Sequence, residues 1–210
     1  GVELVGKDAY VVKSSGTIYE VQKFNTDQQK TLKYNSFLGK GNDIEGLAYD
    51  RANNRLLMAC KGYGHFQEDG DKMYKPIYAF SLEGKQVAEK PVFIIELEAV
   101  RTFLKAHKTE EEQLDDFDDF FKEKIKSLPF SPSAIAVHPL SGNIYVASSV
   151  GKMLMVLDSE GNILHIEKLK KKVHRQPEGM AFESDGTLYI SNEGKDGTGS
   201  IHQFVPKGVE

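Results

Sequence analysis

Carboxylate, amide and hydroxyl side chains recur at corresponding places in several similar stretches of the chain. Each of these stretches has two successive apolar runs. Just before the first run stand Asp43, Glu45, Ser133 and Glu178, and just after the second run stand Lys61, Asn192 and Glu193. Hard cations such as Ca²⁺ take about 6–8 oxygen ligands. We therefore predict a ligand-binding group made of these residues, with Glu45, Glu178, Asn192 and Glu193 as candidate metal ligands and Ca²⁺ as the cofactor that would fit. The alternative is structural, with Glu45 and Glu178 accepting hydrogen bonds from neighbouring backbone N–H groups.

Other catalytic signatures are weak or missing in the sequence. The six histidines show no His-x-x-His or His-Glu-x-x-His spacing, which argues against a zinc site. There is no Gly-x-Ser-x-Gly motif and no phosphate-binding Walker loop. The single cysteine, Cys60, excludes an intramolecular disulfide and ends an apolar run, so we expect a buried, inert thiol. No catalytic residue is assigned.

One short run of the chain is strongly basic. Residues 168–175 read Lys-Leu-Lys-Lys-Lys-Val-His-Arg. A charge run of this kind usually forms a solvated connection, which is the expectation here. Binding of an anionic ligand or a lipid headgroup is the alternative.

The elements that position these residues follow from an internal repeat. Units that begin near residues 1, 46, 134 and 179 share one pattern of three short β-rich runs, separated by turns such as Asn-Asn, Ser-Gly-Asn and Ser-Asp-Gly. The starts are 45, 88 and 45 residues apart, which indicates a repeat of about 45 residues with one insertion. This period predicts an all-β β-propeller, as a single domain over residues 1–210. A β-sandwich is the alternative, but it does not explain the repetition.

Propeller geometry explains why residues far apart in sequence would meet. The first strand of each blade lies innermost and the second returns antiparallel to it, so the start of one and the end of the other share one face at the mouth of the central channel. The predicted rim thus collects the polar residues named above. Segment 62–70 would lie on the same face, which makes Tyr63 a further candidate for ligand binding.

The last unit has only six residues after Phe204, too few for a fourth strand, and Gly1 already lies in the first strand of unit one. Open strand edges are costly. We therefore expect that an N-terminal strand or blade is missing from this sequence.

Residues 97–127 break the β pattern. Leu97, Val100, Phe103 and Leu104 have helical spacing, and a second apolar face runs from Leu114 to Leu128 beside acidic residues. We expect a helical hairpin packed on the propeller with a solvated acidic face. The alternative is a lid over the channel or a docking surface.

Composition narrows the class of partner. The net charge is −4, with 27 Lys and Arg against 31 Asp and Glu, so we expect no nucleic-acid binding. The longest uncharged apolar run, Pro91–Ile95, is far shorter than the ~20 residues of a membrane helix. The chain starts at Gly1, which suggests a processed or engineered start, so a missing signal peptide says nothing about location.

The motifs Asp43-Ile-Glu-Gly-Leu-Ala-Tyr49, Gln176-Pro-Glu-Gly-Met-Ala-Phe182 and Leu188-Tyr-Ile-Ser-Asn-Glu193 resemble those of the bacterial SdiA-regulated domain family, which is related to NHL-repeat and phytase-like propellers. The resemblance covers essentially the whole chain apart from the insertion. It implies a five- or six-bladed propeller, exported to the periplasm or anchored at the outer membrane, often as a lipoprotein. It also implies channel-mouth positions for Glu45, Glu178, Asn192 and Glu193. Ser133 departs from the pattern, because the family has Glu there.

Three functions remain open at this point. The favoured one is a non-catalytic, envelope-associated binding module that presents its rim to a protein, a glycan or a small ligand. The second is a metal-dependent hydrolase like the propeller lactonases and phytases, with Lys61 stabilising negative charge. The third is a scaffold in an envelope complex, with the acidic hairpin as its contact surface. We expect a monomer.

Overall fold

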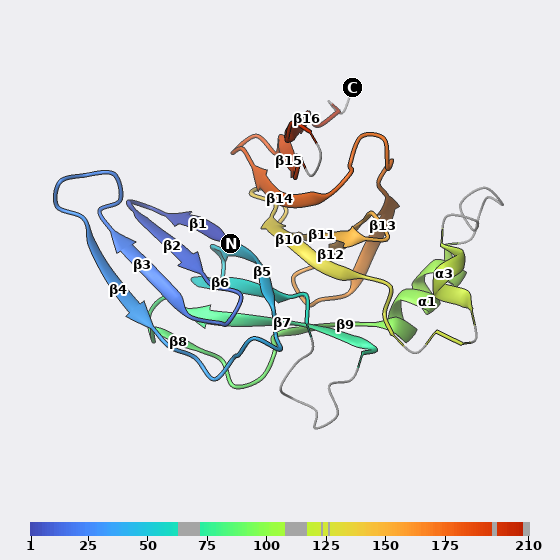
Figure 1. The fold of residues 1–210 in the computed structure, drawn as a ribbon, viewed down its shortest axis with the longest axis horizontal. Helices are drawn as coiled ribbons and strands as arrows, with labels where there is room; N and C mark the ends of the chain where they lie inside the picture. The colour runs from blue at the N-terminus through green and yellow to red at the C-terminus, as the bar shows by residue number, and fades with distance from the viewer. Residues whose placement is uncertain (63–71, 108–116, 123, 126, 195–196, 208–210) are drawn as a thin grey trace.

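The computed structural model describes residues 1–62, 72–107, 117–122, 124–125, 127–194 and 197–207. Four antiparallel sheets follow one another along the chain (Figure 1). The first contains β1 (Val2–Val5), β2 (Asp8–Val12), β3 (Ile18–Gln22) and β4 (Lys30–Tyr34). The second contains β5 (Ile44–Asp50), β6 (Arg55–Cys60), β7 (Tyr74–Ser81) and β8 (Gln86–Val87), with β9 (Phe93–Glu96) also paired to β7.

The third and fourth sheets complete the described part of the fold. The third contains β10 (Ser131–Val137), β11 (Ile144–Val150), β12 (Met153–Leu157) and β13 (Ile163–Lys168), and the fourth contains β14 (Pro177–Phe182), β15 (Leu188–Asn192) and β16 (Ser200–Phe204). In every sheet the strands pair in chain order, except that β9 pairs with β7. The first strands are neighbours across the sheets, because β5 contacts β1 and β10, and β10 contacts β14. Four sheets around a common set of inner strands are four blades of a β-propeller, which confirms the predicted fold class.

The turns between the first two strands of each blade explain part of the repeat. Asn54, Gly142 and Gly186 occupy corresponding turns and have φ angles of 48°, 74° and 89°. Left-handed backbone is strained for most residues, whereas glycine and asparagine adopt it readily. The repeated Asn and Gly positions are therefore the residues that let each hairpin close.

Apolar side chains fill the space between neighbouring blades. Between blades one and two, one cluster includes Ile18, Leu56, Tyr78 and Phe80, all with no exposed surface. A larger cluster joins blades two and three and includes Leu57, Ile77, Phe130, Val146 and Met155. Burial of such faces between blades is the main stabilising contribution to the fold.

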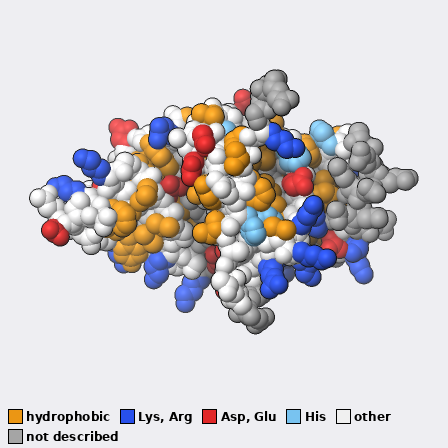
Figure 2. Space-filling model, turned by 90° about the horizontal axis from the view of Figure 1, so that it is seen from above, with side chains coloured by type: hydrophobic (Ala, Val, Ile, Leu, Met, Phe, Trp, Pro, Cys, Tyr) orange, Lys and Arg blue, Asp and Glu red, His pale blue; other side chains and the backbone are white. Residues whose placement is uncertain are grey.

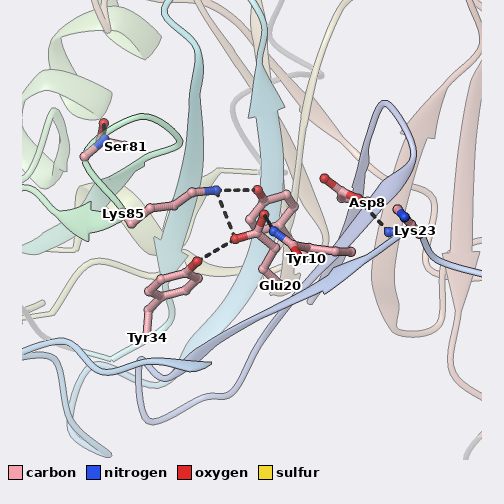
Figure 3. Close-up of polar contacts among 9 residues, drawn as sticks. Asp8, Tyr10, Glu20, Lys23, Tyr34, Ser81 and Lys85 are labelled. Carbon is pink, nitrogen blue, oxygen red and sulfur yellow. Dashed lines mark hydrogen bonds and ion pairs between the residues drawn. The ribbon is translucent and has the colours of Figure 1, made fainter. Parts of the chain in front are cut away.

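A polar cluster also joins blades one and two (Figure 3). Glu20 on β3 is buried, and its carboxylate accepts hydrogen bonds from the Tyr34 hydroxyl at 2.6 Å and the Lys85 ammonium at 2.9 Å. Lys85 belongs to the turn between β7 and β8 and also donates to the Tyr10 hydroxyl at 3.0 Å. Burial alone would raise the pKa of Glu20, but hydrogen bonds from Tyr34, Lys85 and Gln22 lower it below the ordinary value. We call Tyr10, Glu20, Tyr34 and Lys85 the interblade clamp.

The insertion packs on the blades. It contains α1 (Leu97–Ala106) and the single-turn α3 (Asp118–Phe121). Leu97, Val100, Phe117 and Phe120 are buried in the same cluster as Phe130 of the third blade. The helices are thus part of the core, as the packed-hairpin interpretation expects, and the lid interpretation gains no support from the described residues.

The described residues after Phe121 are not helical, although the prediction continues the helical apolar face to Leu128. The expected apolar face from Leu114 to Leu128 begins outside the described residues, and α3 ends at Phe121 because Lys122 has extended backbone with φ −66° and ψ 122°. Beyond it, the Leu128 N–H donates to the carbonyl of Lys72 at 2.7 Å. That N–H therefore bonds to the segment before β7 instead of continuing a helix.

The two end blades expose apolar side chains that inner blades bury. Val2 and Leu4 of β1 are 66% and 56% exposed, and Ile201 and Phe204 of β16 are 71% and 43% exposed. Hydrophobic side chains are spread over the middle of the face in Figure 2.

In the described ranges, no helix is long and apolar enough to cross a membrane.

Candidate functional site

Three inner strands begin with the same irregularity. Ile44 pairs with Cys60 but Gly46 pairs with Ala59, which leaves Glu45 as an extra residue in β5. The same shift leaves Ser133 extra in β10 and Glu178 extra in β14. These β-bulges re-aim the side chains of the extra residues, and bulges are common beside functional sites. The three positions predicted from sequence are therefore equivalent in the fold.

Glu45 and Glu178 line one cleft, which we call the central cleft. It has a volume of about 400 Å³ and lies along the inner strands, with Gly46, Leu47, Ile135 and Met180 among its walls. Burial raises the pKa of Glu45, Lys61 partly offsets this, and the nearby carboxylates of Asp43 and Glu178 raise it further. The Lys61 ammonium lies 3.7 Å from the Glu45 carboxylate.

Ser133, the third bulged residue, is used within the fold. It is buried, and its hydroxyl donates to the carbonyl of Pro177 at 2.6 Å. This contact joins the start of β10 to the start of β14 in the next blade. A serine here thus has a structural contact at the place where blades two and four carry an acid.

Asn192 and Glu193 line a second cleft, the outer cleft. It has a volume of about 910 Å³ and lies between residues 171–176, which connect β13 to β14, and the segment after β15. Asn192 pairs with Pro177 at the start of β14, so both clefts border the same end of the fourth blade. The sequence prediction placed Asn192 and Glu193 with Glu45 and Glu178, whereas the structure divides them between two clefts.

The described part of the chain contains no group of three or more His, Cys, Asp or Glu that could hold a metal ion. Glu45 and Glu178 of the central cleft can supply at most four carboxylate oxygens, whereas Ca²⁺ takes roughly 6–8 oxygen ligands. A Ca²⁺ ion held by these two carboxylates would therefore need further oxygen ligands to complete its shell.

Two further sequence candidates have different outcomes. Tyr63 lies outside the described residues. Cys60 is fully buried, and burial raises its pKa to about 12, so the thiol stays protonated at neutral pH.

A buried lysine that contacts the backbone of Lys61 was not found from the sequence. Lys75 is 4% exposed, donates to the Lys61 carbonyl, and burial lowers its pKa to about 8. Because β7 is buried along almost its whole length, the usual exposure of lysine is no guide at this position.

The glycine that follows Glu45 permits close packing of blades two and three. A Cβ at Gly46 would lie 2.8 Å from the Ile135 side chain and 3.0 Å from its backbone nitrogen. A Cβ at Gly179, the corresponding residue of blade four, would meet only the Ser191 side chain. A side-chain hydroxyl can rotate away, but backbone cannot.

We therefore expect Gly46→Ala to lower the free energy of unfolding by about 2 kcal/mol and Gly179→Ala to lower it by less than about 1 kcal/mol. Urea denaturation of both variants checks this. Equal losses would contradict the packing argument.

Bulged inner strands, four consecutive antiparallel blades and clefts at one end define a protein of the β-propeller class. The family model for "SdiA-regulated" proteins matches residues 86–195, just over half of the 210-residue chain. The chain therefore belongs to the SdiA-regulated family. No curated protein matches the chain significantly.

Solved structures show the same fold at low sequence identity. A luciferin-regenerating enzyme matches with a TM-score of 0.55 and 13% identity over 99% of this chain and 61% of its own. A nidogen/laminin complex matches with a TM-score of 0.54 and 14% identity, over 93% of this chain and 56% of its own. Virginiamycin B lyase from Staphylococcus aureus matches with a TM-score of 0.51 and 12% identity, over 98% of this chain and 54% of its own. The chain thus spans between half and two thirds of the length of these propellers.

Proposed function

We propose that this chain is a ligand-binding propeller module that acts in the bacterial envelope and does no catalysis of its own. The observation that carries the proposal is the pair of clefts at one end of the fourth blade, framed by the bulged Glu178 and by Asn192. Concave sites with a few polar groups in mostly apolar walls are typical of ligand binding. Family membership is compatible with export, and cell fractionation would test the location.

The described residues offer incomplete catalytic groups. Ser200 lies with its hydroxyl oxygen 3.1 Å from Nε2 of His202, which resembles a nucleophile and its base. The partners of His202 within the described ranges are Ser200 and the ring of His174, and no carboxylate is among them. A third group that orients the base is thus lacking there.

A metal-dependent hydrolase is the second candidate. It is favoured by the two carboxylates of Glu45 and Glu178 in one cleft, and by structural similarity to propellers whose names denote a luciferin-regenerating enzyme and a lyase. Because that similarity is at 12–13% identity, it supports the fold and leaves the chemistry open.

Thermal unfolding in the presence of ligand panels tests both candidates. A ligand at 100 times its dissociation constant stabilises the folded state by about 2.7 kcal/mol. For a central-cleft ligand we expect the shift to be lost in Glu178→Gln and kept in Glu89→Gln, which removes an exposed carboxylate of the second blade. Absence of any shift with small molecules, glycans and envelope proteins would contradict the binding module.

A divalent-ion series separates the two candidates. EDTA treatment followed by Ca²⁺, Mg²⁺ or Mn²⁺ gives no Glu178-dependent shift if the module binds without a metal. An ion-specific shift that is lost in Glu178→Gln, together with turnover of phosphate esters or lactones, would replace the binding module with the hydrolase.

A further inference from the structure

The outer cleft is the larger of the two clefts at this end of the fold. Its volume of about 910 Å³ is within the range of roughly 300–1,000 Å³ that holds small ligands. One wall is the connection from β13 to β14, and the other comes from the end of β15 and the start of β16. The cleft therefore lies between the connection from blade three to blade four and the strands of blade four, and one chain supplies both of its walls.

Three cations line the first wall: Lys171, Lys172 and Arg175. All three are exposed, and within the described ranges none of them has an acidic partner within ion-pair distance. Lys and Arg side chains, with histidines among them, gather toward the lower right of the face in Figure 2. Unpaired cations around a cleft favour a ligand with a phosphate or carboxylate group.

Buried polar groups stand behind these cations. His174 is 4% exposed, and burial, with His202 beside it, lowers its pKa, so it is a neutral ring at neutral pH. Asn192 is 7% exposed, and its amide nitrogen lies 3.5 Å from Nδ1 of His174. Its amide oxygen is buried and has no hydrogen-bond partner among the described residues. Such an oxygen is costly to leave unpaired, and a donor O–H or N–H would satisfy it.

The second wall adds groups that bind hydroxyls. Thr198 and Ser200 each carry a hydroxyl that can donate and accept, and Glu193 can accept from a ligand. A purely inorganic anion would use the cations and leave these acceptors unmatched. A ligand that combines an acidic group with hydroxyl groups would use both walls.

We infer that the outer cleft binds an acidic carbohydrate, that is, a sugar bearing a phosphate or a carboxylate. Lys172 and Arg175 bind the acidic group, while Asn192, Glu193 and Ser200 accept or donate hydrogen bonds to the hydroxyls. This inference rests on the proposed function, because it names the ligand class of one of the two clefts. It also gives the basic segment 168–175 a role beyond that of a solvated connection.

Calorimetric titration with four probes tests the inference: glucose 6-phosphate, glucuronate, glucose and inorganic phosphate. We expect one or both acidic sugars to bind more tightly than inorganic phosphate, and glucose to bind least. Phosphate and carboxylate forms are distinguished by which of the two acidic sugars binds more tightly. Affinity should fall as salt is added, because screening weakens contacts between exposed charges.

Variants locate the binding. The double variant Lys172→Gln with Arg175→Gln should bind the acidic sugar at least about tenfold more weakly, since charge-assisted hydrogen bonds are lost. Lys30→Gln with Lys33→Gln removes the same charge from exposed residues of β4 and should leave affinity unchanged. Asn192→Ala, with folding checked by its melting curve, should weaken binding of the acidic sugar and leave binding of inorganic phosphate unchanged. NMR shifts of the His202 ring report the site directly.

Three results would overturn the inference. They are equal affinity for inorganic phosphate and the acidic sugars, equal losses in the two double variants, and no binding of either acidic sugar at millimolar concentration. If acidic sugars fail while another ligand class shifts the melting curve, only the ligand class is wrong. If no ligand of any class shifts it, the proposed function is wrong as well.

Discussion

Replacing Phe120 by alanine is expected to lower the free energy of unfolding by about 3–4 kcal/mol. Phe120 is 2% exposed and lies edge-on to Phe117, with ring centroids 6.2 Å apart. Both rings belong to the cluster that joins the second and third blades. Truncation would leave a cavity between the helices and the blades. Nε of Arg101 on α1 donates a hydrogen bond to the Phe120 carbonyl at 2.6 Å. Because this bond holds the backbone of Phe120 in place, the backbone cannot easily move in to fill the cavity.

Chemical denaturation measures this loss, with Phe24→Ala as the matched control. Phe24 is 50% exposed, so its truncation should change stability by less than about 0.5 kcal/mol. A small effect at Phe120 would mean that the helices are a removable cover, and it would revive the lid interpretation of residues 97–127.

Replacing Lys85 by methionine is expected to cost about 2–3 kcal/mol. The change removes the cation that pairs with Glu20, whose side chain is 3% exposed, and leaves a buried carboxylate with neutral hydrogen-bond partners such as Tyr34 and Gln22. The Lys85 side chain is 34% exposed, so the expected loss is smaller than that for a fully buried pair.

A double-mutant cycle separates the ion pair from packing. The double variant Lys85→Met with Glu20→Leu should have a free energy of unfolding closer to that of the wild-type protein than either single variant has, because no buried charge is left unpaired. Lys33→Met, on the exposed side of β4, is the control for loss of a surface lysine. Additive losses would show that the clamp contributes packing alone.

The same cycle has a pH dependence. The pKa of Glu20 is lower in the folded chain than in the unfolded one, so its ionised form stabilises the fold above the unfolded pKa. That contribution is lost as the pH falls through the folded pKa. The stability difference between wild type and Lys85→Met should therefore shrink in acid, as urea denaturation at several pH values would show.

Sequence periodicity was a good guide to the blades because each blade is built from neighbouring segments. Turn residues such as Asn54 and Gly142 recur where hairpins close, so the repeat and the strands followed directly. The rim residues Glu45 and Glu178 were found by the same repetition, and they do line one cleft.

Features that depend on how strands pair with one another could not be predicted from the sequence repeat. The bulges at Glu45, Ser133 and Glu178 arise from register between two strands, and the hydrogen bond of Ser133 to Pro177 joins separate blades. Similarly, the sequence predicted a helical apolar face as far as Leu128, but α3 ends at Phe121 and the Leu128 N–H bonds to the segment before β7. The separation of Asn192 from Glu45 depends on blade placement, which no local motif contains.

The chain order of the strands has a consequence for how the protein folds. In the first, third and fourth blades every strand after the first pairs with the one before it in sequence, so β1–β4, β10–β13 and β14–β16 are built from local contacts. Closing short loops has a small entropic cost, and chains rich in local contacts fold fast. We expect each sheet to form as its residues leave the ribosome, with docking of Gly46 against Ile135 and closure of the Glu20–Lys85 contact as the later, slower steps.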